Sequence, residues 1–222
     1  MEAIAYISNG FNEKFGIPRQ SGLTAEKSEI IFEPKYRVAE AFRGLGEYSH
    51  IWLLWEFSEA IRSDWSPTVR PPRLGGNQRM GVFATRTPFR PNPIGLSVVK
   101  LEHIDWKHQK GPVLVVSGAD LLNGTPIYDV KPYVPHVDSI PDAEGGFAGK
   151  VKDYKLQVDF PQRYRERVSE ETAEVLVQLL EQDPRPAYQK EPERIYGMSY
   201  GGMEVKFRVE NGCVHVCGID RR

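Results

Sequence analysis

The 222-residue sequence predicts an α+β protein that is mainly β, with a barrel-like N-terminal domain and a small α+β C-terminal domain. Three observations predict this class. Short apolar runs bounded by Gly, Pro, Asn and Ser recur along the first two thirds of the chain, as in β-barrels. One amphipathic segment, 166–184, has helical spacing. No strand pattern is followed by G-x-G-x-x-G, which argues against a Rossmann fold.

Most segments of the N-terminal part carry strand patterns. Residues 50–57 are a continuous apolar run, typical of a buried strand, whereas 94–106 alternates like a half-buried one. A short helical pattern covers 34–49, and 63–79 is a long turn-rich loop of a kind that is often functional. The strand candidates, in chain order, are 3–8, 28–34, 50–57, 80–85, 94–106, 111–120 and 127–134.

The composition changes around residues 138–153, which are polar, acidic and rich in glycine. This change predicts a linker or mobile loop, and we divide the chain into domains at 1–150 and 151–222. A strand at 154–160 precedes the helix, which Pro184 ends. The segments 194–200, 204–212 and 213–220 then predict a small antiparallel sheet, with Asn211-Gly212 as a hairpin turn.

The charge is unevenly distributed. The net charge is only −1, so bulk charge indicates no nucleic-acid partner. Between Trp65 and Leu101, however, five arginines and one lysine occur without any acidic residue. Such a basic stripe is expected of a site for phosphate or another anion, although scattered surface arginines are the alternative.

Several common sites are not indicated. Cys213 and Cys217, four apart in a strand pattern, are expected to be reduced core residues on one face. The five histidines are too dispersed for a metal site, and His50 is expected to be a hydrogen-bonded core residue. There is no phosphate-binding P-loop and no nucleophile elbow. Without a signal-peptide pattern or an apolar run of about 20 residues, the sequence predicts a cytoplasmic protein with no membrane segment.

The segment 79–97, RMGVFATRTPFRPNPIGLS, has the composition of a rigid ligand-binding loop. Its prolines stiffen the chain before a ligand arrives, so less entropy is lost on binding. Gly95 allows close approach of a ligand, and the amide of Asn92 can both donate and accept hydrogen bonds. Arg86 and Arg90, four apart, would share a face of an extended segment.

Two other segments add polar groups to this picture. Asp120 precedes the turn NGTP, whose backbone amides and Thr125 hydroxyl can hold a polar ligand; a plain hairpin loop is the alternative. In FGIPRQSG, residues 15–22, Arg19 and Gln20 place two planar hydrogen-bonding groups in a loop.

These segments together resemble the TrmO (YaeB-like) family of S-adenosylmethionine-dependent tRNA (adenine-N6)-methyltransferases. The resemblance rests on PTVRPPRLGGNQRMGVFATRTPFRPNPIGLSVVKL, preceded by FGIPRQSGL and followed by DLLNGTPIYDVKPYVP. It implies a β-barrel methyltransferase fold and a homodimer, with S-adenosylmethionine held between barrel loops near the subunit interface. It also implies that the substrate is the threonylcarbamoyl-modified adenosine beside the anticodon of threonine tRNA, methylated at N6.

The resemblance also implies a set of cofactor-binding residues. Two positions depart from the family pattern, because Asn123 stands where many members have Asp and Ser58 stands at a variable position, sometimes His. The implied cofactor contacts are Pro18, Arg19, Gln20, Ser58, Glu59, Arg86, Leu96, Leu122, Asn123, Gly124 and Thr125.

The catalytic and RNA-binding residues are hypotheses. Asn92 or Asp120 would accept the N6 proton, with Glu59, Asp138 and His136 as alternatives. The arginines expected to follow the phosphates of the anticodon stem-loop are Arg62, Arg70, Arg73, Arg79 and Arg90. Either Arg73 or Arg90 would instead pair with the threonyl carboxylate. A non-catalytic RNA- or nucleotide-binding barrel, or a methyltransferase of the same fold with another substrate, remains the alternative.

Overall fold

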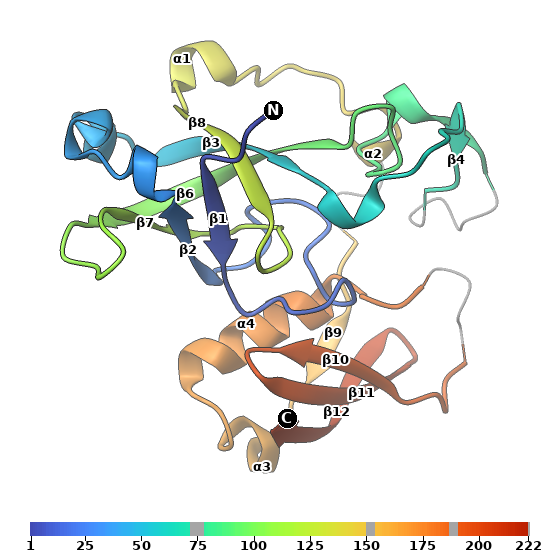
Figure 1. The fold of residues 1–222 in the computed structure, drawn as a ribbon. Coiled ribbons are helices and arrows are strands. Elements are labelled where there is room, and N and C mark those ends of the chain that lie inside the picture. Colours follow the sequence, from blue (N-terminus) through green and yellow to red (C-terminus); the bar gives the residue numbers. More distant parts are fainter. Residues whose placement is uncertain (72–77, 150–153, 187–190, 222) are drawn as a thin grey trace.

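The computed structural model describes residues 1–71, 78–149, 154–186 and 191–221 (Figure 1). Six strands form a closed barrel in the order β1-β2-β7-β6-β3-β8, and each pair of neighbours is antiparallel. The barrel strands are β1 (Ala5–Ser8), β2 (Lys27–Phe32), β3 (His50–Glu56), β6 (Ile94–Asp105), β7 (Val113–Ser117) and β8 (Pro126–Pro132). The predicted β-barrel is thus confirmed.

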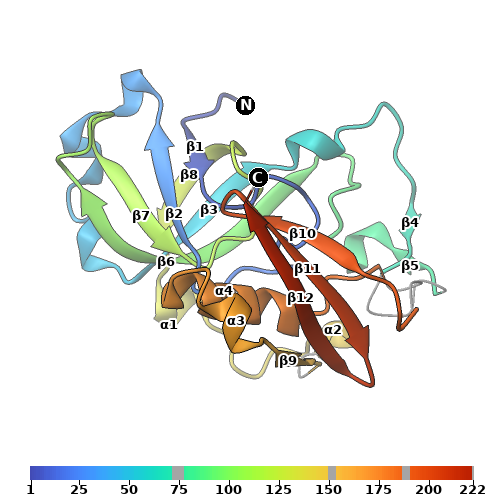
Figure 2. The ribbon, with the colours of Figure 1, turned by 90° about the horizontal axis from the view of Figure 1, so that it is seen from below.

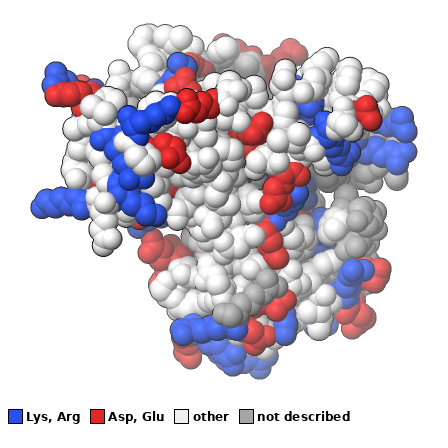
Figure 3. Space-filling model, in the orientation of Figure 1, with Lys and Arg blue, Asp and Glu red and all other residues white. Residues whose placement is uncertain are grey.

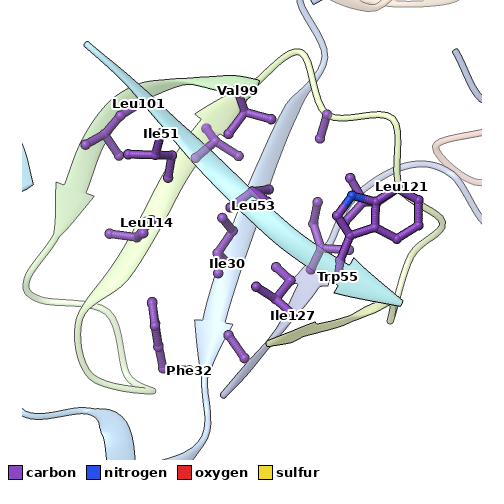
Figure 4. Close-up of a cluster of buried hydrophobic side chains, with 14 of the residues drawn as sticks. Ile30, Phe32, Ile51, Leu53, Trp55, Val99, Leu101, Leu114, Leu121 and Ile127 are labelled. Atoms are coloured by element: carbon purple, nitrogen blue, oxygen red, sulfur yellow. The ribbon is translucent and has the colours of Figure 1, made fainter. Parts of the chain in front are cut away.

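The barrel closes around side chains that alternate along its strands (Figure 4). Ile51, Leu53 and Trp55 of β3 point inward, and Val99 and Leu101 of β6 meet them. This is the period-two pattern by which a strand buries one face and exposes the other. The interior is filled by side chains, as in other small barrels, so ligands are expected at its loops.

Two N-terminal predictions were wrong in detail. Residues 34–49 form three 3₁₀ turns and no α-helix; Phe42 is the one buried residue in them, and Gly44, with φ +83°, interrupts the chain. Of 80–85, only β5 (Met80–Gly81) is a strand, which pairs with β4 (Thr68–Val69). Residues 82–84 turn into a 3₁₀ helix instead.

The C-terminal part is a four-stranded sheet covered by a helix. Its helices and strands are α3 (Gln162–Arg165), α4 (Glu170–Glu181), β9 (Gln157–Asp159), β10 (Tyr196–Tyr200), β11 (Met203–Glu210) and β12 (Cys213–Arg221). The predicted antiparallel strands and the hairpin at Asn211-Gly212 are present, with both turn residues at positive φ. The sheet is not wholly antiparallel, because β9 lies parallel to β12. Two single-turn helices, α1 (Pro135–Asp138) and α2 (Gly146–Gly149), precede this part.

The cysteines and His50 are not core residues, contrary to expectation. Both thiols are free and partly exposed. The alternation of β12 buries Val214 and Val216 and turns Cys213 the other way, and Cys217 lies at a register shift. His50 is also partly exposed, with Nδ1 2.9 Å from the hydroxyl of the adjacent serine.

The loop 9–24 connects the two parts of the molecule (Figure 2). Phe11 is buried in the C-terminal core, where its ring lies 5.5 Å from that of Tyr200, and Phe15 and Ile17 pack against the same core. The carbonyl of residue 10 accepts a 3.0 Å hydrogen bond from the amide of residue 201. The C-terminal part therefore holds a loop that begins at a barrel strand. No helix in the described ranges is long and apolar enough to cross a bilayer.

Candidate cofactor and nucleic-acid site

The loop 9–24 contacts several of the residues predicted to bind the cofactor. The ammonium of Lys14 lies 3.1 Å from a carboxylate oxygen of Glu59. Farther along the loop, Oε1 of Gln20 accepts a 2.5 Å hydrogen bond from Nη1 of Arg86. Segments that are far apart in the sequence, near residues 20, 59 and 86, therefore meet at one loop.

The predicted turn 122–125 contacts the same loop. The side-chain oxygen of Asn123 accepts a hydrogen bond from the amide of Asn9 at 3.1 Å, and its Nδ2 donates to Oδ1 of Asn12 at 3.1 Å. Thr125 is buried, and its amide donates to the carbonyl of Leu122 at 3.1 Å, which closes the turn. The turn is thus held in one conformation by neighbours on both sides.

Asp120 is buried next to this cluster, where Arg86 and the Ser21 backbone act on its carboxyl. Its carboxylate accepts a 2.6 Å hydrogen bond from the buried hydroxyl of Ser97, which in turn accepts one from the indole N–H of Trp55 at 3.0 Å. Burial raises the pKa of Asp120, while the Ser97 hydroxyl, the positive charge of Arg86 and the backbone N–H of Ser21 act against that rise. A carboxylate that gains a proton more readily than usual is suited to act as a base.

Gly95 makes room for this chain of hydrogen bonds. It lies opposite Trp55 in the β3–β6 pairing, and a Cβ at residue 95 would lie 2.2 Å from Cε2 of the indole. We expected a ligand to approach the backbone closely at Gly95, but the Trp55 ring occupies this space instead. The glycine allows the indole to lie flat against the strand and donate to Ser97.

The other candidate bases have different surroundings. Asp138 accepts hydrogen bonds from the Val134 amide at 2.8 Å and from Nε1 of Trp52 at 3.0 Å, and these bonds lower the pKa of its carboxyl. A carboxylate with a lowered pKa is a weak base. His136 is exposed on the same short helix, and Asn92 is exposed on its loop. Within the described ranges, no hydrogen bond joins Asn92 to Asp120.

Some predicted cofactor residues do not face the cluster. The side chain of Leu96 is exposed on the outer face of β6, since its neighbours in the strand point inward. Ser58 is exposed in a 3₁₀ turn after β3. Pro18 is buried, and the Arg19 guanidinium donates to the carbonyl of Asp183 at 3.0 Å, so these two residues attach the loop to the C-terminal part.

The predicted RNA-binding arginines belong to the segment 62–90, which includes β4 and β5, and Figure 3 shows Lys and Arg side chains on the side of the molecule where Figure 1 places β4. Arg62, Arg70 and Arg79 are exposed. Arg90 donates to the carbonyls of residues 82 and 85 at 3.1 and 2.7 Å, so it also stabilises its own loop. Arg73 lies outside the described residues.

Ser97 and Trp55 were missed by sequence reasoning. A signal was present for Ser97, because the alternation of 94–106 places it on the inward face among apolar residues. A hydroxyl in that position needs a partner, and Asp120 follows the next strand. No comparable signal exists for Trp55, because its partnership depends on the register between two distant strands.

Comparisons with known proteins agree with these observations. The family model for the tRNA-methyltransferase O N-terminal domain matches residues 6–139, and that for the TrmO C-terminal domain matches 153–222. A tRNA (adenine(37)-N6)-methyltransferase of Escherichia coli is 39% identical over 100% of this chain and 97% of its own length. A putative S-adenosylmethionine-dependent methyltransferase of Pseudomonas aeruginosa is 44% identical over 91% and 89%. The crystal structure of a P. aeruginosa TrmO superposes with a TM-score of 0.80 at 36% identity, covering 99% and 95% of the two chains.

Proposed function

The chain belongs to the TrmO family and is a tRNA (adenine-N6)-methyltransferase, and from this premise we propose that it acts on the threonylcarbamoyl-modified adenosine beside the anticodon. We take residues 1–150 as the methyltransferase domain and 151–222 as the domain that holds the loop 9–24. A tRNA substrate implies a cytoplasmic enzyme. The observation that carries the proposal is that the loop 9–24 contacts both Arg86 and the turn 122–125, while Arg86 and the N–H of Ser21 in this loop act on the buried carboxyl of Asp120.

The residues of this cluster fit S-adenosylmethionine by their chemistry. The cofactor has a carboxylate, an ammonium group, a sulfonium and an adenine. Arg86 supplies a cation for the carboxylate, and Asp120 supplies an anion for a positively charged group. The amides of the turn 122–125 and the side chain of Gln20 provide further hydrogen bonds. Bound there, the cofactor supplies a methyl group on a positively charged sulfur.

The protein must then orient the acceptor and take its proton. The lone pair of N6 is delocalised into the carbamoyl group, so its N–H proton has to leave as the bond to the methyl carbon forms. We assign this proton to Asp120, because burial raises the pKa of its carboxyl and Ser97 fixes its position. Asn92 can hold the N–H through its amide oxygen, but a neutral amide does not accept the proton.

The basic stripe serves RNA binding in this proposal. Exposed arginines such as Arg62, Arg70 and Arg79 would contact phosphates of the anticodon stem-loop, which makes affinity salt-dependent. A guanidinium can also pair with the threonyl carboxylate in a bidentate manner. Arg73 and Arg90 are our candidates for that contact.

We also propose that the enzyme is a homodimer. Large apolar side chains are exposed on the outer face of β6, where Ile94 is 41% and Leu96 55% exposed, two residues apart on the same face of the strand. Apolar groups exposed together in this way are typical of protein interfaces. Light scattering on the purified protein should give a mass twice that of one chain. The Leu96→Glu variant should have the mass of a single chain.

Methyl transfer to two preparations of threonine tRNA tests the substrate. One carries the threonylcarbamoyl group and the other is the unmodified transcript. With labelled S-adenosylmethionine, label should enter the first and not the second, and an Asp120→Asn variant should transfer about 10²–10⁴-fold more slowly, the usual contribution of a proton acceptor. Equal labelling of both tRNAs would contradict the proposed substrate.

A further inference from the structure

Three large aromatic side chains project into solvent from the segment 60–90. Trp65 is 53% exposed, Phe83 72% and Phe89 39%. The ring centroids of Trp65 and Phe83 lie 6.1 Å apart, with their planes inclined by 33°. None of the three belongs to either hydrophobic core found among the described residues. Aromatic rings gathered outside a core are typical of an interaction surface.

Two of these rings border a small hollow. Trp65 and Phe89 line a pocket of about 110 Å³, together with Arg62 and Arg90. Pockets for drug-sized molecules are larger, about 300–1,000 Å³. The hollow therefore suits one planar ring rather than a whole nucleotide cofactor, and it does not include Asp120 or its neighbours.

Two arginines lie over the aromatic rings. The guanidinium carbon of Arg62 lies 3.8 Å from the centre of the Phe89 ring, and that of Arg90 lies 5.8 Å from the centre of Phe83. Two backbone carbonyls anchor Arg90 in addition. The surface thus presents aromatic and guanidinium planes side by side, and unpaired bases of RNA stack on both kinds of plane.

We propose that Trp65 and Phe83, flanked by Arg62 and Arg90, form a stacking platform for one unpaired nucleobase of the RNA substrate. The inference rests on the proposed tRNA substrate. It adds a binding site for a base outside the cluster around Asp120.

Charge favours RNA over a second copy of the chain. Asp64 is the one acidic residue in the sequence from 60 to 101, and this stretch contains six arginines. In a two-fold symmetric dimer the same patch would meet itself, so arginines would face arginines. A phosphate backbone next to the platform instead complements them.

Binding of labelled RNA to tryptophan variants tests the platform. The RNA is a fluorescent anticodon stem-loop, and a duplex of the same length serves as the RNA without an unpaired base. Trp106→Ala is the matched control, since Trp106 is also 53% exposed but lies beyond β6, in its connection to β7. We expect Trp65→Ala to weaken stem-loop binding about tenfold, equivalent to about 1.4 kcal/mol and within the range for stacking on one base. Trp65→Phe should retain most of the affinity.

Salt titration separates stacking from phosphate contacts. Trp65→Ala should leave the slope of log Kd against log salt unchanged, whereas Arg70→Ala should reduce it by about 1. The proposal would be overturned if Trp65→Ala bound the stem-loop as tightly as Trp106→Ala does. It would also be overturned if Trp65→Ala lost as much affinity for the duplex as for the stem-loop. Conversion of a dimer to a monomer by Trp65→Ala without RNA would also overturn it, because the surface would then join two copies.

The platform and the proposed function fail differently. If the wild-type protein methylates tRNA while Trp65→Ala behaves like Trp106→Ala, only the platform is wrong. If the wild-type protein binds the stem-loop through Trp65 but transfers no methyl group to tRNA, the proposed function is wrong and the platform stands. A wild-type protein that binds no RNA contradicts both.

Discussion

Replacing Gly95 by alanine should destabilise the protein, although alanine normally favours a regular element over glycine by roughly 0.5–1 kcal/mol. The new Cβ would lie 2.2 Å from Cε2 of Trp55, about 1.2 Å short of the 3.4 Å at which ordinary contact begins. Forcing a methyl group into a packed core costs typically about 1–3 kcal/mol. Displacing the indole also breaks its 3.0 Å hydrogen bond to Ser97, and a buried unpaired donor costs about 1–3 kcal/mol. We therefore expect a net loss of about 1–5 kcal/mol in the free energy of unfolding.

Urea unfolding followed by circular dichroism measures this loss as a change in midpoint at constant slope. Gly81→Ala is the matched control. Gly81 has φ −59°, and no atom lies within 4 Å of the Cβ that would be added. Its unfolding free energy should stay within about 0.5 kcal/mol of the wild type.

Wild-type stability in Gly95→Ala would refute the argument that the Trp55 ring occupies this space. A double variant, Gly95→Ala with Trp55→Phe, tests the same contact. The smaller ring leaves room for the methyl group, so the double variant should lose less than the sum of the single losses, by about 0.5 kcal/mol or more. Strict additivity would show that the two residues do not compete.

Three further predictions concern the cluster and its loop. The pKa of Asp120 is higher in the folded than in the unfolded state, so protonation of this carboxyl favours folding. The free energy of unfolding of the wild type, compared with that of Asp120→Asn, should therefore be greatest below pH about 4. Urea unfolding at a series of pH values should show this difference declining as pH rises through the raised pKa. Arg86→Lys should weaken S-adenosylmethionine binding in calorimetry by about tenfold, because an ammonium does not reproduce the planar contact with Gln20; unchanged affinity would remove Arg86 from the site. Phe11→Ala should lower the free energy of unfolding by about 3–5 kcal/mol and also weaken cofactor binding, because the loop 9–24 loses its packing beside Tyr200. A loss of stability with unchanged cofactor affinity would show that this loop does not contribute to the cofactor site.

Much of the fold follows from local patterns. The alternation in 94–106 predicts β6 (Ile94–Asp105) almost to the residue, and Asn211-Gly212 predicts its hairpin because both positions need positive φ. The segment 34–49 is different. It has apolar residues at helical spacing, yet Gly44 adopts a left-handed conformation and the chain turns repeatedly. Spacing alone does not reveal such a break.

The site was predictable as a set of residues but not as an arrangement. The sequence marks Arg86 as part of a basic segment stiffened by prolines, and Asp120 as the charged residue that precedes the turn NGTP. The contacts of Arg86 with Gln20 and of Asp120 with Ser97 depend on the tertiary fold, which brings distant segments together. Arg90 shows the limit of local patterns, since an arginine that binds its own loop looks the same in sequence as one that faces RNA.

Mass spectrometry of the product identifies the nucleoside and the atom that this enzyme methylates. Threonine tRNA bearing the threonylcarbamoyl group is incubated with the enzyme and S-adenosylmethionine carrying a deuterated methyl group, then digested to nucleosides and fragmented. We expect one labelled methyl group on the adenine base of the threonylcarbamoyl nucleoside, at N6, and almost none with Asp120→Asn. Label on a ribose, on another nucleoside or on no nucleoside would contradict this expectation.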